Sequence, residues 1–133
     1  MRAFHINIVT PDGPSFDGEV ESLLVRTDDG DVEILAGHAD FFAAIDTGRV
    51  RLLIDGKPRF ASANGGFLSV KAGNVTLCAI TFEFADQIDL KRAEEAKARA
   101  EAAISAAKDE RDERIAKAKL ARAASRIKVA NMK

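Results

Sequence analysis

Cysteine is almost absent from this chain, and long apolar runs are missing altogether. The single cysteine, Cys78, excludes an internal disulfide and a zinc site built from several thiolates. No segment approaches the roughly 18 continuous apolar residues of a membrane-spanning helix. Residues 1–5 lack the apolar core of a signal peptide, so we expect a cytoplasmic location.

Motifs that carry catalytic chemistry are also missing. The sequence has no glycine-rich phosphate loop with its Lys-Ser/Thr pair, no HExxH and no GxSxG. His5 and His38 are far apart on different predicted elements, and Cys78 lies in an apolar strand that favours an inert, buried thiol. The acidic run at 28–33 lacks the spacing of a calcium-binding loop. We therefore expect no enzyme activity, no catalytic residue and no bound metal.

The last third of the chain contains neither glycine nor proline. From Ile88 to Val129 the sequence is mostly Ala, Lys, Arg and Glu, which are the best helix formers. The polar run 108–112 interrupts this pattern and predicts a turn between two helices. These helices could fold back on each other as an antiparallel hairpin or straighten into one.

Residues 1–84 have the opposite composition, because they hold all eight Phe, all nine Gly and all three Pro. Apolar and polar residues alternate in them, which predicts several short strands. Between the strands lie turn signals such as Asp55-Gly56, which is typical of a type I′ hairpin turn. The pattern predicts a β-sandwich or flattened barrel at 1–84 and a helical module at 85–133, an α+β fold.

Charge is divided unevenly between these two parts. Residues 1–84 contain seven Lys/Arg and twelve Asp/Glu, a net charge of −5, whereas 85–133 contain thirteen and nine, a net charge of +4. The basic arm either meets an anionic partner or is a solvated helix whose cations favour its C-terminal end through the macrodipole. The arm has no aromatic residues on which bases could stack, so we expect no nucleic-acid binding.

Four arginines in the arm are spaced so that a folded hairpin would gather them. Arg92 and Arg99 are two turns apart on the first helix. Arg122 and Arg126 are one turn apart on the second. Such cations repel unless an anion lies among them, and arginine suits polyphosphate through planar bidentate contacts. Asp89 can cap the first helix and accept a hydrogen bond from a ligand. The hairpin offers either a pocket for a nucleotide or another polyanion, or four exposed arginines balanced by glutamates.

Both predicted helices carry a stripe made mainly of alanine. The stripe on the first helix is Leu90, Ala93, Lys97, Ala100, Ile104 and Ala107. The stripe on the second is Ile115, Ala118, Ala123 or Ala124, Ile127 and Ala130. At about 0.8 kcal/mol per buried CH₂, alanine stabilises such a seam weakly, so we expect the helix pair to open easily.

Several segments together resemble a known family over the whole length of the chain. They read Ile8-Val9-Thr10-Pro11-Asp12-Gly13-Pro14, Ile34-Leu35-Ala36-Gly37-His38-Ala39, Gly65-Gly66-Phe67-Leu68-Ser69-Val70, Asn74-Val75-Thr76-Leu77 and Ile88-Asp89-Leu90-Lys91-Arg92-Ala93. In this order they closely resemble the epsilon subunits of bacterial F-type ATP synthases. The resemblance implies an N-terminal ten-stranded β-sandwich followed by a C-terminal helical hairpin. The chain departs from the family loop at Glu33, Ala36 and Asp40-Phe41, where a Gly, a Pro and a Pro-Leu are usual.

The resemblance also implies a role as a non-catalytic subunit of the central stalk in a proton- or sodium-translocating complex. The subunit would be peripheral, at the cytoplasmic face of the cell membrane. Its sandwich would bind the gamma subunit and the polar loops of the c-ring. Its extended arm would reach the catalytic beta and alpha subunits and block ATP hydrolysis. The residues implied at the gamma and c-ring interface are Asp28, Asp29, Asp31, Gly37, His38 and Asp40.

In bacillus-like members of this family the compact arm binds ATP without hydrolysing it. The residues that the resemblance implies at an ATP site here are Glu83, Ile88, Asp89, Arg92, Ala93, Arg99, Arg122 and Arg126. The hypothesis is that ATP is a regulatory ligand that holds the arm folded. One alternative is the same rotor subunit with a structural or coupling arm that senses no nucleotide. Another is a free-standing adaptor that binds polyanions.

Overall fold

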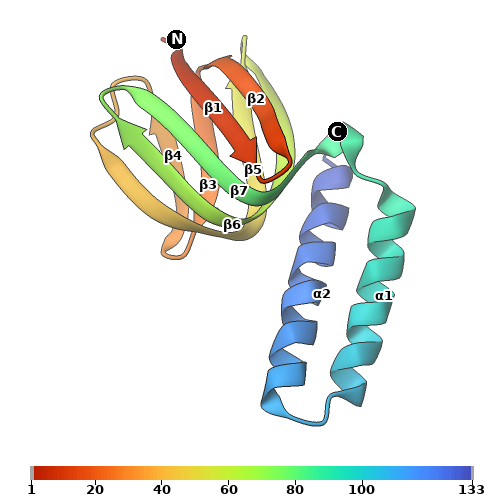
Figure 1. Cartoon of the computed structure of the whole chain (residues 1–133). Helices are drawn as coiled ribbons and strands as arrows, with labels where there is room; N and C mark the ends of the chain where they lie inside the picture. The colour runs from red at the N-terminus through yellow and green to blue at the C-terminus, as the bar shows by residue number, and fades with distance from the viewer. Residues whose placement is uncertain (1, 133) are drawn as a thin grey trace.

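The computed structural model describes residues 2–132 as a β-sandwich from which a two-helix hairpin projects (Figure 1). The strands are β1 (Phe4–Thr10), β2 (Gly13–Val20), β3 (Ser22–Thr27), β4 (Gly30–Leu35), β5 (Phe41–Ile54), β6 (Lys57–Lys71) and β7 (Asn74–Phe84). A short 3-10 helix, η1 (Ala85–Gln87), leads into α1 (Leu90–Ala106) and α2 (Glu110–Ala130). The α+β class and the antiparallel hairpin predicted from the sequence are confirmed.

Within residues 2–132 the strands are hydrogen-bonded in the order β2-β1-β7-β6-β5-β3-β4. Neighbouring strands are antiparallel except for β1 and β7, which run parallel from Ile6 beside Val75 to Val9 beside Cys78. This pairing places the first strand against the strand that leads into the arm.

The prediction of ten strands is wrong, and both β5 and β6 continue through glycine-containing segments, Thr47-Gly48 and Asn64-Gly65-Gly66, where the sequence suggested breaks. Residues 2–132 form seven strands, and β5, β6 and β7 contain 14, 15 and 11 residues. Strands β5 and β6 are not paired between Ala44 and Gly48, but they are paired on both sides of this gap. Gly65 and Gly66 have positive φ and let β6 bend there without ending. Each long strand is visibly curved (Figure 1).

Strand β2 is an element that the sequence pattern did not predict. Its sequence, GPSFDGEV, is poor in strand formers. It nevertheless pairs with β1 along its whole length, from Phe4 beside Val20 to Thr10 beside Gly13. Tertiary pairing therefore overrides weak local propensity here. The turn at Asp55-Gly56 is as predicted, because both residues have positive φ, 51° and 78°.

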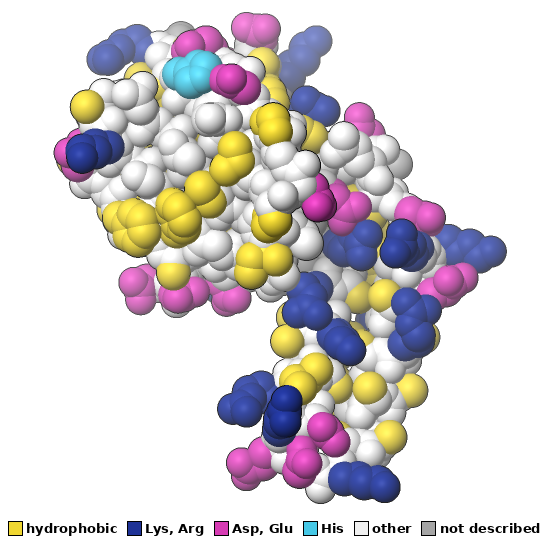
Figure 2. Space-filling model, viewed as in Figure 1, with side chains coloured by type: hydrophobic (Ala, Val, Ile, Leu, Met, Phe, Trp, Pro, Cys, Tyr) yellow, Lys and Arg dark blue, Asp and Glu magenta, His cyan; other side chains and the backbone are white. Residues whose placement is uncertain are grey.

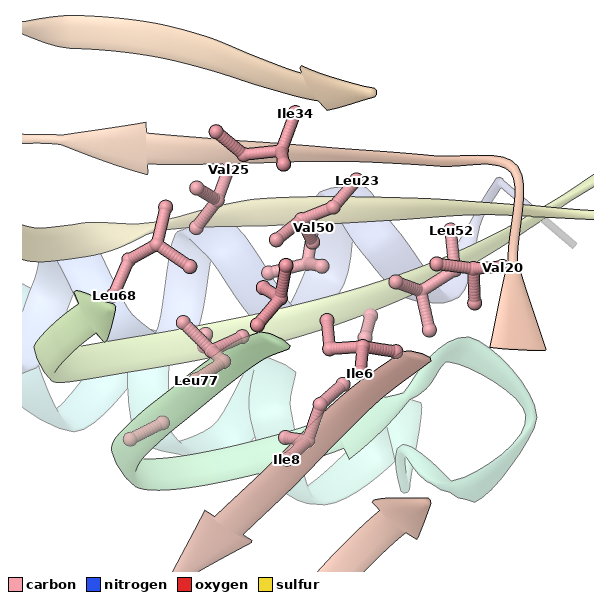
Figure 3. Close-up of a cluster of buried hydrophobic side chains, with 14 of the residues drawn as sticks. Ile6, Ile8, Val20, Leu23, Val25, Ile34, Val50, Leu52, Leu68 and Leu77 are labelled. Carbon is pink, nitrogen blue, oxygen red and sulfur yellow. The ribbon is translucent and has the colours of Figure 1, made fainter. Parts of the chain in front are cut away.

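The core of the sandwich is made by apolar side chains from both ends of the sheet order. Figure 3 shows Ile6, Ile8, Val20, Leu23, Val25, Ile34, Val50, Leu52, Leu68 and Leu77 lying together. Each of these is at most 1% exposed. Because a buried leucine typically contributes about 2–5 kcal/mol over alanine, these side chains contribute strongly to the stability of the body.

Each helix of the arm begins at an aspartate that caps it. The Asp89 carboxylate accepts a hydrogen bond from the backbone N–H of Arg92 at 3.1 Å, and Asp109 accepts one from Asp112 at 2.8 Å. Ala107 and Asp109 are extended, and they end α1 and reverse the chain. The turn therefore begins one residue before the predicted run 108–112.

The seam between the helices is made mainly of alanine, as predicted, and the predicted stripe on α2 is correct at Ala123 and Ala130 but wrong at Ile115 and Ala118. Ala116 and Ala123 are buried, whereas Ile115 is 44% exposed and Ala118 is exposed. On α1, Ala93 and Ala100 are buried while Leu90 and Lys97 are exposed. Alanine occurs on nearly every face of α2, so spacing alone did not determine which side chains line the first half of the seam.

Candidate functional site

The arm contacts the body through the last two turns of α2. Val129 and Ala130 pack against Ala85 and Ile88, with Phe60 of β6 at the edge of this cluster. The rest of the hairpin extends away from the sandwich (Figure 1). The docked apolar area is small, so the contact holds the arm with little hydrophobic free energy.

Two polar contacts lie beside this apolar cluster. The hydroxyls of Ser62 and Ser125 share a hydrogen bond of 2.9 Å. Nη2 of Arg126 donates to the Glu83 carboxylate at 3.3 Å. Nε of Arg126 lies 2.8 Å from the other oxygen of Glu83, without the alignment of a hydrogen bond. Both side chains are about one third exposed or less, so water weakens the ion pair only in part.

A groove of 490 Å³ runs between the two helices and is the candidate functional site. Its lining residues are Ala96, Arg99, Ala100, Ala103, Lys119, Arg122, Ala123 and Arg126. Small alanines form its floor and long cationic side chains form its rim. Figure 2 shows Lys and Arg side chains gathered along the hairpin where it meets the sandwich.

The groove is strongly electropositive. Arg99, Arg122 and Lys119 make no ion pair within residues 2–132, whereas Arg126 is paired with Glu83. Three uncompensated cations therefore surround a concave surface that bears no carboxylate among its described lining residues. Such a surface recognises an anion with several oxygens.

Three of the four predicted arginines meet in this groove, and one does not. Arg92 is exposed and lies two turns, about 10 Å, before Arg99 on α1. Lys119 is a groove residue that the sequence reasoning missed. Its signal was its position three residues before Arg122, on the same face of α2.

The other predicted ATP-site residues occupy positions around the base of the hairpin. Asp89 caps α1 and is exposed, and Glu83 holds Arg126. Ile88 is 6% exposed and packs against the end of α2. Ala93 is fully buried in the seam, so its methyl group presents no surface to a ligand in this conformation.

The six predicted interface residues lie in two separate places. Asp28 and Asp29 form the exposed turn before β4, and the loop 36–40 follows β4. The six-residue strand between them holds the two segments about 20 Å apart. Asp40 accepts a hydrogen bond from the backbone N–H of Ala72 at 3.0 Å, which ties its loop to the β6–β7 turn. Their role at an interface stays a prediction.

The remaining predicted interface residues make specific contacts within the chain. Asp31 lies 3.4 Å from Arg26 and 3.9 Å from Arg49. The His38 ring packs edge-on against Phe41 at 5.7 Å between centroids. Gly37 has positive φ, +83°, which suits glycine at this turn. Within residues 2–132 no three His, Cys, Asp or Glu side chains are placed to hold a metal ion.

Comparison with known proteins assigns the chain to a family. The family model described as ATP synthase, Delta/Epsilon chain, beta-sandwich domain matches residues 3–85. The model of its long alpha-helix domain matches residues 86–131. The chain belongs to the ATP synthase delta/epsilon chain family. The recognition made from the sequence is thereby confirmed, and the chain is a non-catalytic subunit of the ATP synthase, as predicted.

Relatives in this family are similar over nearly their whole length. The chain is 43% identical to the ATP synthase epsilon chain of Bacillus velezensis over 130 residues, which are 98% of each chain. It is 39% identical to the epsilon chain of Bacillus cytotoxicus over 133 residues, which are 100% of each.

Solved structures show the same fold at lower identity. A chain in the Euglena gracilis mitochondrial ATP synthase matches with a TM-score of 0.82 at 21% identity, covering 97% of this chain and 81% of that one. A chain in the Tetrahymena thermophila central stalk and c-ring matches with a TM-score of 0.65 at 12% identity, covering 96% and 93%. In residues 2–132 no helix is both long and apolar enough to cross a membrane.

Proposed function

We propose that this epsilon-type subunit belongs to the central stalk and carries an arm that ATP holds in its folded form. The observation that carries the proposal is the groove between α1 and α2, which Arg99, Arg122 and Lys119 line without an ion pair to any other described residue. Its volume of 490 Å³ lies in the range of small-molecule sites, about 300–1,000 Å³. ATP would be bound and not hydrolysed.

Charge explains why a polyphosphate would favour the folded arm. Like charges a few ångströms apart near a protein surface repel by on the order of 1–4 kcal/mol per pair. Closing the hairpin brings Arg99 of α1 toward Lys119 and Arg122 of α2, so closure without an anion carries this penalty. Phosphate oxygens would replace repulsion by charge-assisted hydrogen bonds. Opening the hairpin separates the cations and destroys the site.

Because the seam is weak, the free energy that a bound polyphosphate contributes would be enough to shift the arm between its folded and open forms. Alanines form the seam, and two polar contacts with a small apolar cluster hold the arm to the body. A ligand needs a differential affinity of about 5.5 kcal/mol to shift such an equilibrium from 1:99 to 99:1. High ATP would keep the arm folded. Low ATP would release it to extend toward the catalytic beta and alpha subunits and inhibit hydrolysis.

The sandwich would bind the remaining partners, the gamma subunit and the polar loops of the c-ring. The segments proposed for these contacts are the turn at Asp28, Asp29 and Asp31 and the loop with Gly37, His38 and Asp40. Through these partners the subunit would be peripheral to the membrane, at its cytoplasmic face. Co-purification with the gamma subunit tests this part and would distinguish a rotor subunit from a free-standing adaptor.

Titration calorimetry of the full chain with ATP tests the nucleotide site. Arg99→Ala and Arg122→Ala should each weaken binding about tenfold or more, because each removes charge-assisted hydrogen bonds. Arg114→Ala is the matched control, since Arg114 is exposed on α2 outside the groove. Its affinity should be that of the unchanged chain.

Two results would contradict the proposal in different ways. No heat at millimolar ATP would remove the nucleotide sensor and leave a rotor subunit with a coupling arm. If Arg114→Ala weakens ATP binding as much as the groove variants do, the affinity depends on the overall charge of the arm and the groove is not the ATP site.

A further inference from the structure

A second basic groove lies on another side of α2, where the arm meets the body. We call it the junction groove, and its volume is 330 Å³. Its lining residues are Arg26, Asp31, Thr47, Gly48, Arg49, Ser125, Lys128 and Val129. None of these lines the inter-helical groove. The body supplies five of the eight positions and α2 supplies three, so the groove exists only while the arm is docked.

The body side of the junction groove is hollowed by an irregularity in the sheet. Strand β3 pairs Val25 with Val50 and then Thr27 with Ile45, so residues 46–49 of β5 bulge opposite Arg26. Gly48 sits in this bulge, and the stem of the Arg26 side chain crosses directly over it. A Cβ on Gly48 would lie 2.8 Å from Cβ of Arg26. The missing side chain therefore lets Arg26 reach across β5.

The charges in the junction groove do not balance. Arg26 and Arg49 lie on the body side and Lys128 on the arm side, giving three cations. Asp31 is the single carboxylate among the described lining residues, and it lies 3.4 Å from Arg26 and 3.9 Å from Arg49. Asp31 fixes the two guanidinium groups beside each other and leaves a net charge of +2. Within residues 2–132 no carboxylate lies in ion-pair distance of Lys128.

We propose that the junction groove is a second anion site, which takes a tetrahedral oxyanion of the phosphate class and thereby holds the arm against the body. A hydrogen phosphate dianion matches the charge of +2. Arginine side chains on one wall and a lysine on the other surround it with donors of the kinds that bind phosphate. Because the two walls belong to different modules, a bound anion bridges body and arm. This site does not depend on the ATP site and would act alongside it.

Backbone NMR of the full chain, titrated with inorganic phosphate against sodium chloride at equal ionic strength, tests this proposal. Phosphate should shift the amide signals of residues 47–49 and 125–129 saturably, and chloride should not. Arg49→Ala and Lys128→Ala should each weaken the phosphate affinity about tenfold, since each removes one charged donor. Lys57→Ala is the control, because Lys57 is exposed at the start of β6 outside both grooves, and it should change nothing.

Two further variants separate this site from the ATP site. Gly48→Ala should weaken phosphate binding, because the new methyl group displaces Arg26 while both grooves keep every charge. Arg99→Ala should leave phosphate binding at residues 125–129 unchanged and weaken ATP binding. The proposal is overturned if phosphate instead shifts residues 96–103 and 119–123, or if chloride reproduces the shifts. Neither of these two results contradicts the ATP proposal. Conversely, a chain that binds phosphate at the junction groove but does not bind ATP contradicts only the ATP proposal.

Discussion

Gly66 lies on β6 directly against the backbone of β7. Its φ is +115°, and a Cβ built on it would overlap the carbonyl oxygen of Cys78. Gly13 has a similar φ, +121°, but a Cβ there would meet nothing within 4 Å. At the residue scale, an alanine at Gly13 would therefore meet backbone strain alone, whereas an alanine at Gly66 would meet both backbone strain and steric overlap.

Replacing each of the two glycines by alanine should therefore give different losses of stability. Gly13→Ala should lower the free energy of unfolding by about 1–3 kcal/mol, the typical cost of an unfavourable φ. Gly66→Ala should cost more, about 3 kcal/mol or above, because β6 and β7 must also move apart. Urea unfolding of both variants measures this. Equal losses in the free energy of unfolding would show that β7 can move away from position 66 at little cost.

The two helices of the arm illustrate what decides packing at the scale of an element. Capping aspartates determine where each helix begins, and alanine determines how closely the helices approach. The end of α2 is docked by Val129 and Ala130 in their cluster with Ala85 and Ile88. Earlier in α2, Ala116 is in the seam and Ala118 faces solvent.

Leucine substitutions in α2 test directly which alanine lies in the seam. Ala116→Leu should overpack the seam and lower the stability of the helix pair by about 1–3 kcal/mol. Ala118→Leu should change it by about 0.5 kcal/mol or less, because that side chain is exposed. Alanine and leucine have similar helix propensity, so the pair is matched. Amide hydrogen exchange across α1 and α2 gives both values. A larger loss of stability for Ala118→Leu than for Ala116→Leu would mean that Ala118 lies in the seam, as the sequence predicted.

At the scale of the whole molecule, one ion pair connects the groove in the arm to the body. Arg126 lines the groove and is held by Glu83 at the end of β7. The same guanidinium therefore takes part in arm docking and faces any anion between the helices. If ATP binds in this groove, as proposed, its binding would be coupled to docking of the arm through this side chain.

A double-mutant cycle on Glu83 and Arg126, in the absence of nucleotide, should measure that coupling. Glu83→Ala and Arg126→Ala should each speed amide exchange at residues 129–130, and the double variant should add little more. We expect a coupling energy of about 1 kcal/mol, at the upper end for exposed pairs, because both side chains are partly buried. The pair Glu113–Lys117, 2.8 Å apart within α2, is the control and should not affect this exchange. Additive effects on exchange would mean that the ion pair does not hold the arm.

Local sequence determined the kinds of element in this protein, because composition and periodicity act over a few residues. The alternation and turn signals before residue 85 identify strands, and the Ala-, Lys- and Arg-rich run after it identifies helices. The four-residue spacing placed Arg122 and Arg126 correctly in one groove with Arg99, whereas the seven-residue spacing placed Arg92 there wrongly. Segments shared with the family identified the subunit over its whole length.

Tertiary structure decided everything that depends on which distant segments meet. It formed β2 from a sequence without strand character, continued β5 and β6 through their bends, and placed Ala116 in the seam where Ile115 was expected. It also brought Arg26 and Arg49 of the body to Lys128 of the arm, about 80 or more positions along the chain, to form the junction groove. Residues so far apart in sequence leave no spacing pattern, and a shared contact between them is determined by the packing of the two modules.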